Sequence, residues 1–531
     1  MSLPALITAL LEPAVYPHRP DAVMLVQTHI SYVLLAGDQV YKIKKAVRFS
    51  FLDFSTLERR RHFCHEEVRL NRRLAPDVYR GVVAICEDDG RYRLGSDGDP
   101  AAVEYAVHMR RLPADRTLDR LVDADAVSPE MIDLIAARLA TFHAQADAGP
   151  AVTANGDPSA IWGILDDNYN GVRPFRDRTI ATSDDDAIQM FARRFLDDNA
   201  DLFRRRQSEH RIRDGHGDLH SEHICFDRTL SIFDCIEFNA AFRHCDVASD
   251  IAFLAMDLDY HGHPELAAHL VSRYAVHAGD PEVVRLLPFY CCYRAYVRGK
   301  VDSLTSAEEE VAPAERERAQ RGAWRHFALA YRYTWAYSPC LVVVCGLSGT
   351  GKSAVAATLH TRTGFTHLNS DVVRKRLAGL PPTARVRDAY DTGLYSAELS
   401  ERTYATLFAE AEQQLAAGHG VILDATFQRR SGRDTARALA AAHNVPCLIV
   451  ECRCSEATVR ERLQARAARG DSPSDADWQV YVEQRQRYEP LDADEASRAL
   501  VLDTMAPSGA LSAAIEAALR QRAAGRDVAP R

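Results

Sequence analysis

The feature that most constrains the fold is an apolar segment that runs directly into a glycine-rich loop. Residues 340–345 read CLVVVC, and the loop that follows is Gly346-x-x-x-x-Gly351-Lys352-Ser353. The glycines let successive backbone N–H groups face one anion at the start of the helix-forming segment AVAATLH, where the helix dipole also favours negative charge. This pattern is a phosphate-binding loop (P-loop), whose lysine contacts the β- and γ-phosphates and whose serine hydroxyl binds Mg²⁺. The sequence therefore predicts ATP or GTP binding. The residues expected to contact the nucleotide are Gly346, Leu347, Ser348, Gly349, Thr350, Gly351, Lys352 and Ser353.

Lysine is used sparingly in this chain. Only six of the 65 basic residues are lysines, and one of them is the P-loop lysine. Where a chain so rich in arginine retains lysine, a compact point charge is indicated in place of a planar guanidinium. Three more, Lys42, Lys44 and Lys45, cluster in the segment VYKIKK. This cluster is either part of a second phosphate site or a solvated strand edge.

Length, charge and cysteine content bound the class of protein. A chain of 531 residues with 47% hydrophobic and 26% charged residues is expected to form two or three domains. The net charge of −9 excludes a general nucleic-acid coat, although a nucleic-acid end remains a possible substrate. The twelve cysteines are scattered without zinc-ligand spacing, no apolar run approaches the ~20 residues of a membrane span, and the N-terminus lacks the basic start of a signal peptide. We expect a cytoplasmic protein with reduced thiols.

The order of expected elements divides the chain in two. Strand-like alternation in residues 23–45, a charged helix pattern over 55–74 and strands near 80–109 predict a small lobe of about residues 1–112. Residues 113–335 are mainly helical, with a strand-rich island at 214–238 and an expected helix over the charge-dense segment 305–326. Residues 336–531 alternate strands and helices, which predicts a parallel sheet with helices on both faces. The fold class is α/β for the C-terminal domain and α+β for the N-terminal one.

Carboxylates follow two strands of the C-terminal domain. Asp371 comes directly after the second strand, where it is placed across the crevice from the P-loop to take a proton from an attacking hydroxyl. Asp424 ends the third strand and is a candidate for holding Mg²⁺ through water. Arginines on a movable helix can neutralise charge on a transferring phosphoryl group, and they recur here at Arg460, Arg462, Arg466 and Arg469. The alternatives are that Asp371 only caps a helix and that the arginines form a solvated face.

Four C-terminal segments carry a family resemblance. GLSGTGKS, LNSDVVRKRL, VILDATF and RERLQARAARGDSPSDA resemble P-loop kinases of the AAA and zeta-toxin type, a group that includes polynucleotide 5′-kinases, gluconate kinases and chloramphenicol phosphotransferase. The resemblance covers residues 338 to about 505. It implies that Lys352 and Ser353 contact phosphates and Mg²⁺, that Asp371 is the base, and that Arg466 or Arg469 is a lid arginine. It leaves the acceptor open, because these relatives phosphorylate sugars, antibiotics, nucleic-acid ends and nucleotide sugars.

The N-terminal domain carries a second set of motifs. HGDLHSEH at residues 216–223, IEF at 236–238 and DVASD at 246–250 resemble the aminoglycoside phosphotransferase family, which has the protein-kinase fold. The resemblance spans roughly residues 25–300. It implies that Asp218 accepts the proton of a substrate hydroxyl. It also implies that Lys42, or its rival Lys44, binds phosphate with Glu67 (or Glu66) as its helix partner.

Two departures from that family affect the metal ligands. His223 stands where the family has an asparagine ligand, and Glu237 stands where it has an aspartate, with Asp234 as a competing candidate. Imidazole is a poor partner for Mg²⁺, which prefers oxygen. In addition, no clear glycine-rich phosphate loop lies between residues 28 and 40. Active phosphotransfer and a nucleotide-binding or regulatory pseudokinase therefore both remain open for this domain. His216 and His220 are interpreted as structural loop residues.

Together these observations favour an ATP- and Mg²⁺-dependent phosphotransferase. The C-terminal domain would move the γ-phosphoryl group to a hydroxyl of a small molecule, a nucleotide or a nucleic-acid end, with Ser353 and Asp424 on the metal. The whole chain resembles a bacterial fusion of an aminoglycoside phosphotransferase-like domain with a P-loop kinase. One alternative is an ATP-hydrolysing, toxin-like switch with a pseudokinase domain. Another is antibiotic phosphorylation by the N-terminal domain, whose excess of acidic residues suits a polycationic acceptor.

Overall fold

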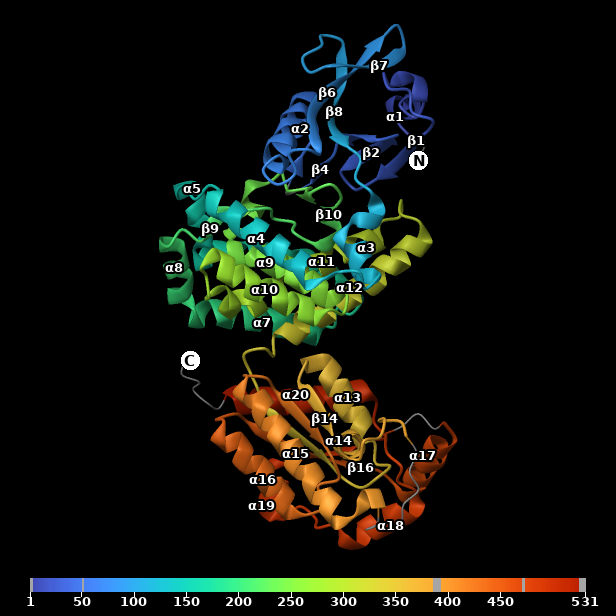
Figure 1. The fold of residues 1–531 in the computed structure, drawn as a ribbon, viewed down its shortest axis with the longest axis vertical. Helices are drawn as coiled ribbons and strands as arrows, with labels where there is room; N and C mark the ends of the chain where they lie inside the picture. Colours follow the sequence, from blue (N-terminus) through green and yellow to red (C-terminus); the bar gives the residue numbers. More distant parts are fainter. Residues whose placement is uncertain (1–2, 50–51, 385–392, 470–472, 525–531) are drawn as a thin grey trace. The chain divides into compact units, whose positions relative to one another are not determined.

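The computed structural model describes residues 3–49, 52–384, 393–469 and 473–524. The chain forms two compact units, Met1–Ala330 and Tyr331–Arg531, and the division falls inside helix α12 (Pro313–Tyr333). The predicted boundary at 335/336 lies just after this helix. Figure 1 shows the first unit from blue to yellow-green and the second from yellow to red.

The N-terminal unit begins with a six-stranded antiparallel sheet in the order β1-β2-β3-β8-β6-β7. Helix α2 (Leu57–Asn71) covers one face, where Cys64 and Val68 pack against Ala84 and Val107 of the sheet. The short helix α1 (Ala5–Ala9) lies against the other face. The strands are β1 (Val23–Gln27), β2 (Ser31–Ala36), β3 (Gln39–Lys44), β6 (Tyr79–Asp88), β7 (Arg91–Ser96) and β8 (Ala102–Arg110).

The alternation of β3 explains why two lysines share a face. Tyr41 and Ile43 point into the cluster beneath α1, so Lys42 and Lys44 point to the opposite face, toward α2. Helix α2 begins after Thr56, whose hydroxyl accepts the N–H of Arg59, a standard N-cap. The strand–helix–strand order expected for residues 23–109 is therefore present, with α2 ending three residues before the expected end.

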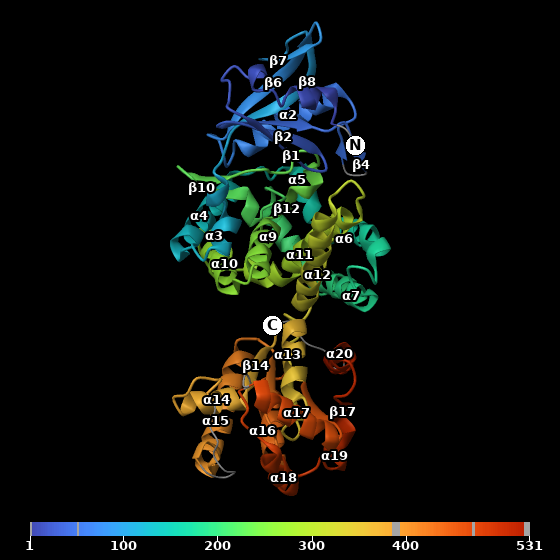
Figure 2. The same ribbon diagram turned by 90° about the vertical axis from the view of Figure 1, so that its right-hand side faces the viewer.

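The rest of the N-terminal unit is mainly helical (Figures 1 and 2). Helix α9 (Val247–Tyr260) is buried along most of its length, since it packs against both α10 (Pro264–Ala278) and α11 (Val283–Ala307). In the strand-rich island, β10 (Ile224–Phe226) and β11 (Leu230–Ile232) form a short antiparallel hairpin. The strand before them, β9 (Ile212–Asp214), pairs antiparallel with β12 (His244–Asp246), which lies beyond the island. The remaining long helices are α4 (Pro129–Gln145), α6 (Pro158–Val172), α7 (Thr182–Asp198) and α8 (Ala200–Ser208).

The expected single helix over residues 305–326 is wrong. Helix α11 ends at Ala307 and α12 begins at Pro313. Proline lacks the N–H that an interior helix position donates, so it is favoured in the first turn and disfavoured further along a helix. The proline therefore starts a new helix in place of continuing the old one.

The C-terminal unit is a five-stranded parallel sheet in the order β14-β15-β13-β16-β17. Helices α15 (Ala397–Ala416) and α16 (Arg430–Ala442) pack on one face, and α13 (Lys352–Thr363) and α20 (Ser508–Ala524) lie together on the other. The strands are β13 (Leu341–Cys345), β14 (Thr366–Asn369), β15 (Val421–Asp424), β16 (Cys447–Arg453) and β17 (Leu500–Asp503). The central strand β13 is buried at every position, as expected for a parallel strand covered on both faces.

Two further expectations concern thiols and membranes. None of the twelve cysteines, all of which lie among the described residues, forms a disulfide. Among the helices that the structure describes, none combines the length and apolar character needed to cross a bilayer.

Candidate functional site

The P-loop joins β13 to α13 at the carboxyl edge of the parallel sheet. Gly346, Gly349 and Gly351 have φ values of +130°, +82° and +92°, a region that side chains rarely adopt. Space is restricted as well, because a Cβ on Gly346 would lie 2.5 Å from the carbonyl oxygen of Cys452. The loop therefore depends on its glycines for both conformation and clearance, as the sequence predicts.

Lys352 begins α13 and lies across the loop. Its Nζ donates to the carbonyl oxygen of Leu347 at 2.8 Å. Removal from water lowers the pKa of the Lys352 ammonium, and the nearby carboxylate of Asp424 opposes this effect. The backbone N–H of Ser348 donates to Oε1 of Gln484 at 2.9 Å, so an amide oxygen from α18 (Trp478–Arg487) lies where the loop presents donors.

Asp424 ends β15 beside the lysine. Its Oδ2 accepts from Nδ2 of Asn369 at 2.6 Å and lies 3.1 Å from Nε2 of His367. Burial alone would raise the pKa of Asp424, but hydrogen bonds from His367 and Ser353 and the charge of Lys352 hold it below its usual value. The Ser353 hydroxyl and an ionised carboxylate are the oxygen ligands that Mg²⁺ prefers, so these residues fit that ion.

Asp371 lies in the first turn of α14 (Ser370–Leu377). The helix is capped by Asn369, whose Oδ1 accepts the N–H groups of Asp371 at 2.9 Å and Val372 at 3.2 Å. The alternative that Asp371 serves as the helix cap is therefore wrong. Its carboxylate instead accepts from Nη1 of Arg374 at 2.6 Å, three residues along the same helix.

One cavity of about 1010 Å³ brings several of the predicted residues together, although Gly346, Leu347 and Thr350 of the P-loop do not line it. Lys352, Ser353, Asp371 and Asp424 all line it, although they come from three separate segments of the chain. The cavity also has lining residues that the sequence did not single out: Arg374, Tyr395, Tyr404, Gln484 and Arg487. Arg374 was detectable, because it follows Asp371 at helical i+3 spacing, whereas the others reach the cavity only through tertiary packing.

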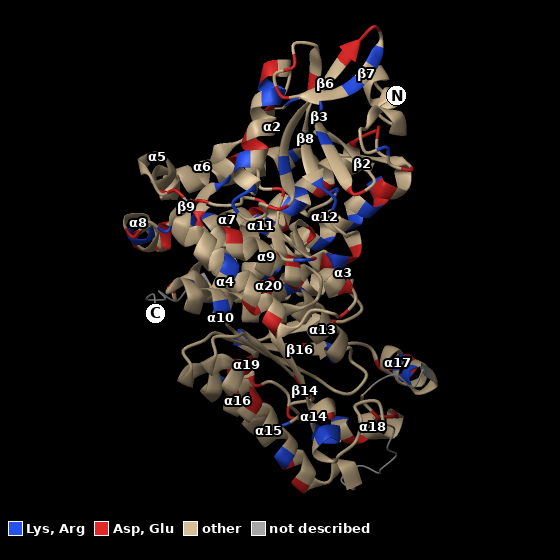
Figure 3. Ribbon diagram, turned by 45° about the horizontal axis from the view of Figure 1, so that its top comes forward, with Lys and Arg blue, Asp and Glu red and all other residues tan. Residues whose placement is uncertain are grey.

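The arginines of α17 (Glu456–Arg469) have different environments. Arg466 lines the cavity and donates to the carbonyl oxygen of Ala476, and burial lowers the pKa of its guanidinium. Arg462 donates to Oγ1 and O of Thr504, and Arg460 stacks 4.2 Å from the ring centroid of Trp478. These contacts argue against the alternative that the arginines of α17 only form a solvated face. The side chain of Arg469 lies outside the described residues. Basic residues appear in blue on α14 and α17 in Figure 3.

The family described as AAA domain (AAA_33) matches residues 341–491. The uncharacterized proteins Rv2004c of Mycobacterium tuberculosis and Mb2027c of Mycobacterium bovis are each 33% identical over 451 residues, which is 85% of this chain and 87% of theirs. This chain belongs to their family. A gluconokinase of Gluconobacter oxydans is 31% identical over 129 residues, 24% of this chain and 66% of the enzyme.

Solved structures of two kinases match about a third of this chain. A gluconokinase from Sinorhizobium meliloti matches at 20% identity and a TM-score of 0.26, covering 36% of this chain and 95% of that one. The APS kinase CysC of Mycobacterium tuberculosis, in complex with AMPPNP and APS, matches at 21% identity and 0.26, covering 34% and 98%. The family match and the gluconokinase relationship show that the C-terminal unit is a P-loop kinase-like domain, which confirms that part of the prediction.

A buried ion cluster joins β3 to α2 in the N-terminal unit. Glu67 lies between both candidate lysines, with Oε1 2.9 Å from Nζ of Lys42 and Oε2 2.7 Å from Nζ of Lys44. The rival Glu66 pairs with Arg69 on the surface instead. The Lys44 side chain is fully buried and that of Lys42 is 14% exposed, so Lys42 is the lysine that a ligand can reach.

Two acidic residues after β11 complete this cluster. Glu237 contacts the ammonium of Lys44 and its side chain is 5% exposed. Asp234 accepts from Nζ of Lys42 at 2.5 Å, and its other oxygen lies 3.5 Å from Nε2 of His223. Of the two carboxylates that the sequence offered as metal ligands, Asp234 thus lies beside His223. The assignment of Glu237 with His223 to a metal stays a prediction.

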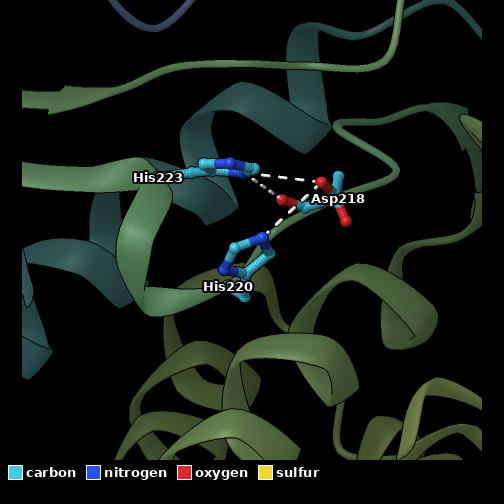
Figure 4. Close-up of side chains that lie close together, drawn as sticks. All are labelled: Asp218, His220 and His223. Carbon is cyan, nitrogen blue, oxygen red and sulfur yellow. Dashed lines mark hydrogen bonds and ion pairs between the residues drawn. The ribbon is translucent and has the colours of Figure 1, made fainter. Parts of the chain in front are cut away.

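Asp218 lies in the loop between β9 and β10. The carboxylate of Asp250 in α9 holds this loop by accepting the N–H groups of His216 at 2.6 Å and Gly217 at 2.9 Å. Oδ2 of Asp218 lies 3.6 Å from a ring nitrogen of His220 and 3.6 Å from one of His223 (Figure 4). Burial would raise the pKa of Asp218, but the histidines and Arg298 hold it well below its usual range. The role of Asp218 as a base stays a prediction.

Proposed function

We propose that this protein is an ATP- and Mg²⁺-dependent phosphotransferase whose C-terminal unit transfers the γ-phosphoryl group to a hydroxyl. The observation that carries the proposal is the single cavity shared by the P-loop lysine and serine, Asp424 and Asp371. Its volume of about 1010 Å³ matches the upper range of roughly 300–1,000 Å³ for small-molecule sites, which suits a nucleotide and an acceptor together.

The roles follow from position and charge. The P-loop amides and Lys352 bind the β- and γ-phosphates, and Ser353 and Asp424 hold Mg²⁺, which supplies further neutralisation of phosphate charge. Asp371 accepts the proton of the acceptor hydroxyl while that oxygen forms the new bond to the γ-phosphorus. The bond from this phosphorus to the β–γ bridging oxygen breaks, and ADP leaves. Arg374 holds the Asp371 carboxylate in place, and Arg466 offsets charge on the transferring group.

For the acceptor we propose a small polyhydroxylated molecule of the type that the gluconokinase relative is named for, with a nucleotide or nucleic-acid end as the alternative. The cavity supports either, because arginine and tyrosine side chains line it beside Asp371. Such side chains offer hydrogen bonds to hydroxyl, carboxylate or phosphate oxygens.

The test is transfer of label from [γ-³²P]ATP with Mg²⁺ into pooled metabolites, nucleotides, RNA and aminoglycosides. Wild type, Lys352→Ala, Asp371→Asn and Asp218→Ala are compared. We expect a labelled product that both C-terminal variants abolish and Asp218→Ala retains. If free phosphate is the sole labelled product of wild type and of every variant that keeps activity, the result would instead support an ATP-hydrolysing switch. A labelled aminoglycoside lost only with Asp218→Ala would place the chemistry in the N-terminal unit.

A second candidate function is nucleotide binding by the N-terminal unit. The specific observation is the ion pair of Lys42 with Glu67, because a strand lysine paired with a helix glutamate is part of the phosphate-binding arrangement of protein kinases. Asp234 contacts the same ammonium. Residual ATP binding in Lys352→Ala that disappears in Lys352→Ala/Lys42→Ala would support this function. No residual binding in Lys352→Ala would refute it.

A further inference from the structure

One peptide unit of the P-loop is held at both ends by side chains. The N–H of Ser348 donates to Oε1 of Gln484 at 2.9 Å, and the carbonyl oxygen of Leu347 accepts from Nζ of Lys352 at 2.8 Å. These two backbone groups belong to the same peptide unit, which is planar and trans, so they point in opposite directions. A partner that fixes the direction of this N–H therefore also fixes the direction of the carbonyl.

The loop sequence does not fix this direction by itself. Gly346 and Gly349 lie on either side of the two residues that share the peptide unit, with φ values of +130° and +82°. Glycine populates positive and negative φ about equally, so the unit between them can rotate unless a partner holds it. Ser348 and Gln484 are each only 7% exposed, so an N–H without a partner here would also be removed from water. Gln484 supplies that partner.

The carbonyl of Leu347 in turn determines where the P-loop lysine lies. An ammonium has three donors, and this carbonyl takes one of them from Lys352. The other two can contact phosphate oxygens, and a P-loop lysine serves the β- and γ-phosphates. If the peptide unit rotated, the carbonyl would move away from Nζ. Lys352 would then lose the contact that holds its flexible side chain across the loop.

Gln484 belongs to a pair of helices that packs on the P-loop. Leu347 packs against a cluster that both α17 and α18 form, namely Val459, Leu463 and Tyr481. A Cβ on Gly349 would lie 2.9 Å from Cγ1 of Val459, so α17 approaches the loop closely. Arg466 of α17 lines the cavity that Gln484 also lines. The same two helices thus supply an arginine to the cavity and a hydrogen-bond acceptor to the loop.

We propose that Gln484 is a positioning residue for Lys352. By accepting the N–H of Ser348, it turns the Leu347 carbonyl onto the lysine ammonium. The P-loop therefore holds its lysine in place for the β- and γ-phosphates only while α17 and α18 are packed against it. This inference rests on the proposed function, because that function assigns Lys352 to those phosphates. It couples the grip on the nucleotide to the position of the two helices that carry Arg466 and Gln484.

The test measures binding of a non-hydrolysable ATP analogue with Mg²⁺, and of AMP, by calorimetric titration of the full-length protein. Every protein carries Lys42→Ala, so that the candidate nucleotide site of the N-terminal unit does not contribute, and the protein with this change alone is the reference. Gln484→Leu keeps the approximate size of the side chain but offers no acceptor, so it should weaken the ATP analogue at least about 10-fold. AMP lacks the β- and γ-phosphates, so its affinity should stay close to that of the reference.

Gln484→Glu separates the loss of the acceptor from other effects of the substitution. It keeps an oxygen that can accept the N–H of Ser348. Its negative charge by itself disfavours phosphate binding, so affinity above that of Gln484→Leu can come only from the restored hydrogen bond. We expect Gln484→Glu to bind the ATP analogue more tightly than Gln484→Leu does. Gln486→Leu changes an exposed glutamine of the same helix and is the matched control, which should bind both ligands like the reference.

The outcomes distinguish this inference from the function on which it rests. The inference alone is overturned if Gln484→Leu binds the ATP analogue as tightly as Gln486→Leu, or if Gln484→Glu binds it more weakly than Gln484→Leu. Equal losses of ATP-analogue and AMP affinity in Gln484→Leu would also overturn it, because they indicate damage to the cavity as a whole. If Lys352→Ala binds the ATP analogue as tightly as the reference, the proposed function fails, and this inference fails with it.

Discussion

Substituting Gly346 by alanine tests the dependence of the phosphate site on the P-loop backbone. At φ +130° a side chain costs roughly 1–2 kcal/mol in backbone strain. The new Cβ would also lie 2.5 Å from the Cys452 carbonyl oxygen and 3.1 Å from Oγ1 of Thr350, an overlap that costs about 1–3 kcal/mol more. The sum is about 2–5 kcal/mol. If the loop relaxes to avoid this cost, its amides no longer converge on the phosphates, and ATP affinity should fall at least about 30-fold.

Gly418 provides the matched control. It lies in the turn before β15 with φ +83°, and nothing lies within 4 Å of an added Cβ. Gly418→Ala therefore carries the backbone strain without the overlap and lies away from the P-loop. Calorimetric titration with an ATP analogue and Mg²⁺, together with thermal unfolding, measures both variants. We expect both to lose stability and only Gly346→Ala to lose binding. ATP affinity equal to wild type in Gly346→Ala would refute the argument that this glycine sets the loop geometry.

Three other predictions follow from the C-terminal unit. Asp371→Asn should lower kcat about 10²- to 10⁴-fold and leave ATP affinity unchanged, and normal turnover in steady-state kinetics would contradict its role as base. Arg433 and Glu495 form a fully buried bidentate pair, with both N–O distances at 2.9 Å. Arg433→Ala should therefore destabilise the unit by about 3–5 kcal/mol in denaturant unfolding, because it leaves a buried carboxylate unpaired. The double variant Arg433→Met/Glu495→Leu should recover much of the lost stability. Burial lowers the pKa of Lys352, so this lysine should lose its charge, and ATP affinity should decline, at a lower pH than an ordinary lysine would give as pH rises toward 10. Calorimetry should show a flatter dependence of ATP affinity on pH for Lys352→Arg than for wild type.

The C-terminal fold was largely predictable because its signals are local. Apolar strands, glycine turns and helix patterns alternate along the chain, and the handedness of parallel connections leaves few arrangements. Asp371 and Asp424 were identified for the same reason, since each lies at or just beyond the carboxyl end of a strand and parallel strands end at one edge of a sheet. Gln484 was not, because it comes from a helix more than a hundred residues beyond the P-loop and reaches Ser348 only in the folded unit.

The contacts within the ion cluster of the N-terminal unit could not be predicted from the sequence. Strand alternation places Lys42 and Lys44 on one face but cannot say which is accessible, because that depends on how α2 and the segment after β11 pack against them. Likewise, Asp234 and Glu237 are three residues apart, and only the folded chain directs one to His223 and the other to Lys44. Local patterns give the residue types at a site, and packing decides their pairing.

The lysines of this chain have specific partners in the structure. Lys42 and Lys44 contact Glu67, and Lys352 lies across the P-loop. The others have specific partners too: Lys45 over the ring of Tyr32, Lys300 with Oδ1 of Asn168 at 2.5 Å, and Lys375 with Asp475 at 3.0 Å. A solvated strand edge is therefore wrong as an account of Lys44, whose side chain is fully buried. A guanidinium is wider than an ammonium and carries five donors in a fixed plane, so it cannot occupy the space between Glu67 and Glu237 without leaving donors unpaired. In a chain that otherwise uses arginine, Lys42, Lys44 and Lys375 mark places where a small charge is enclosed by its partners.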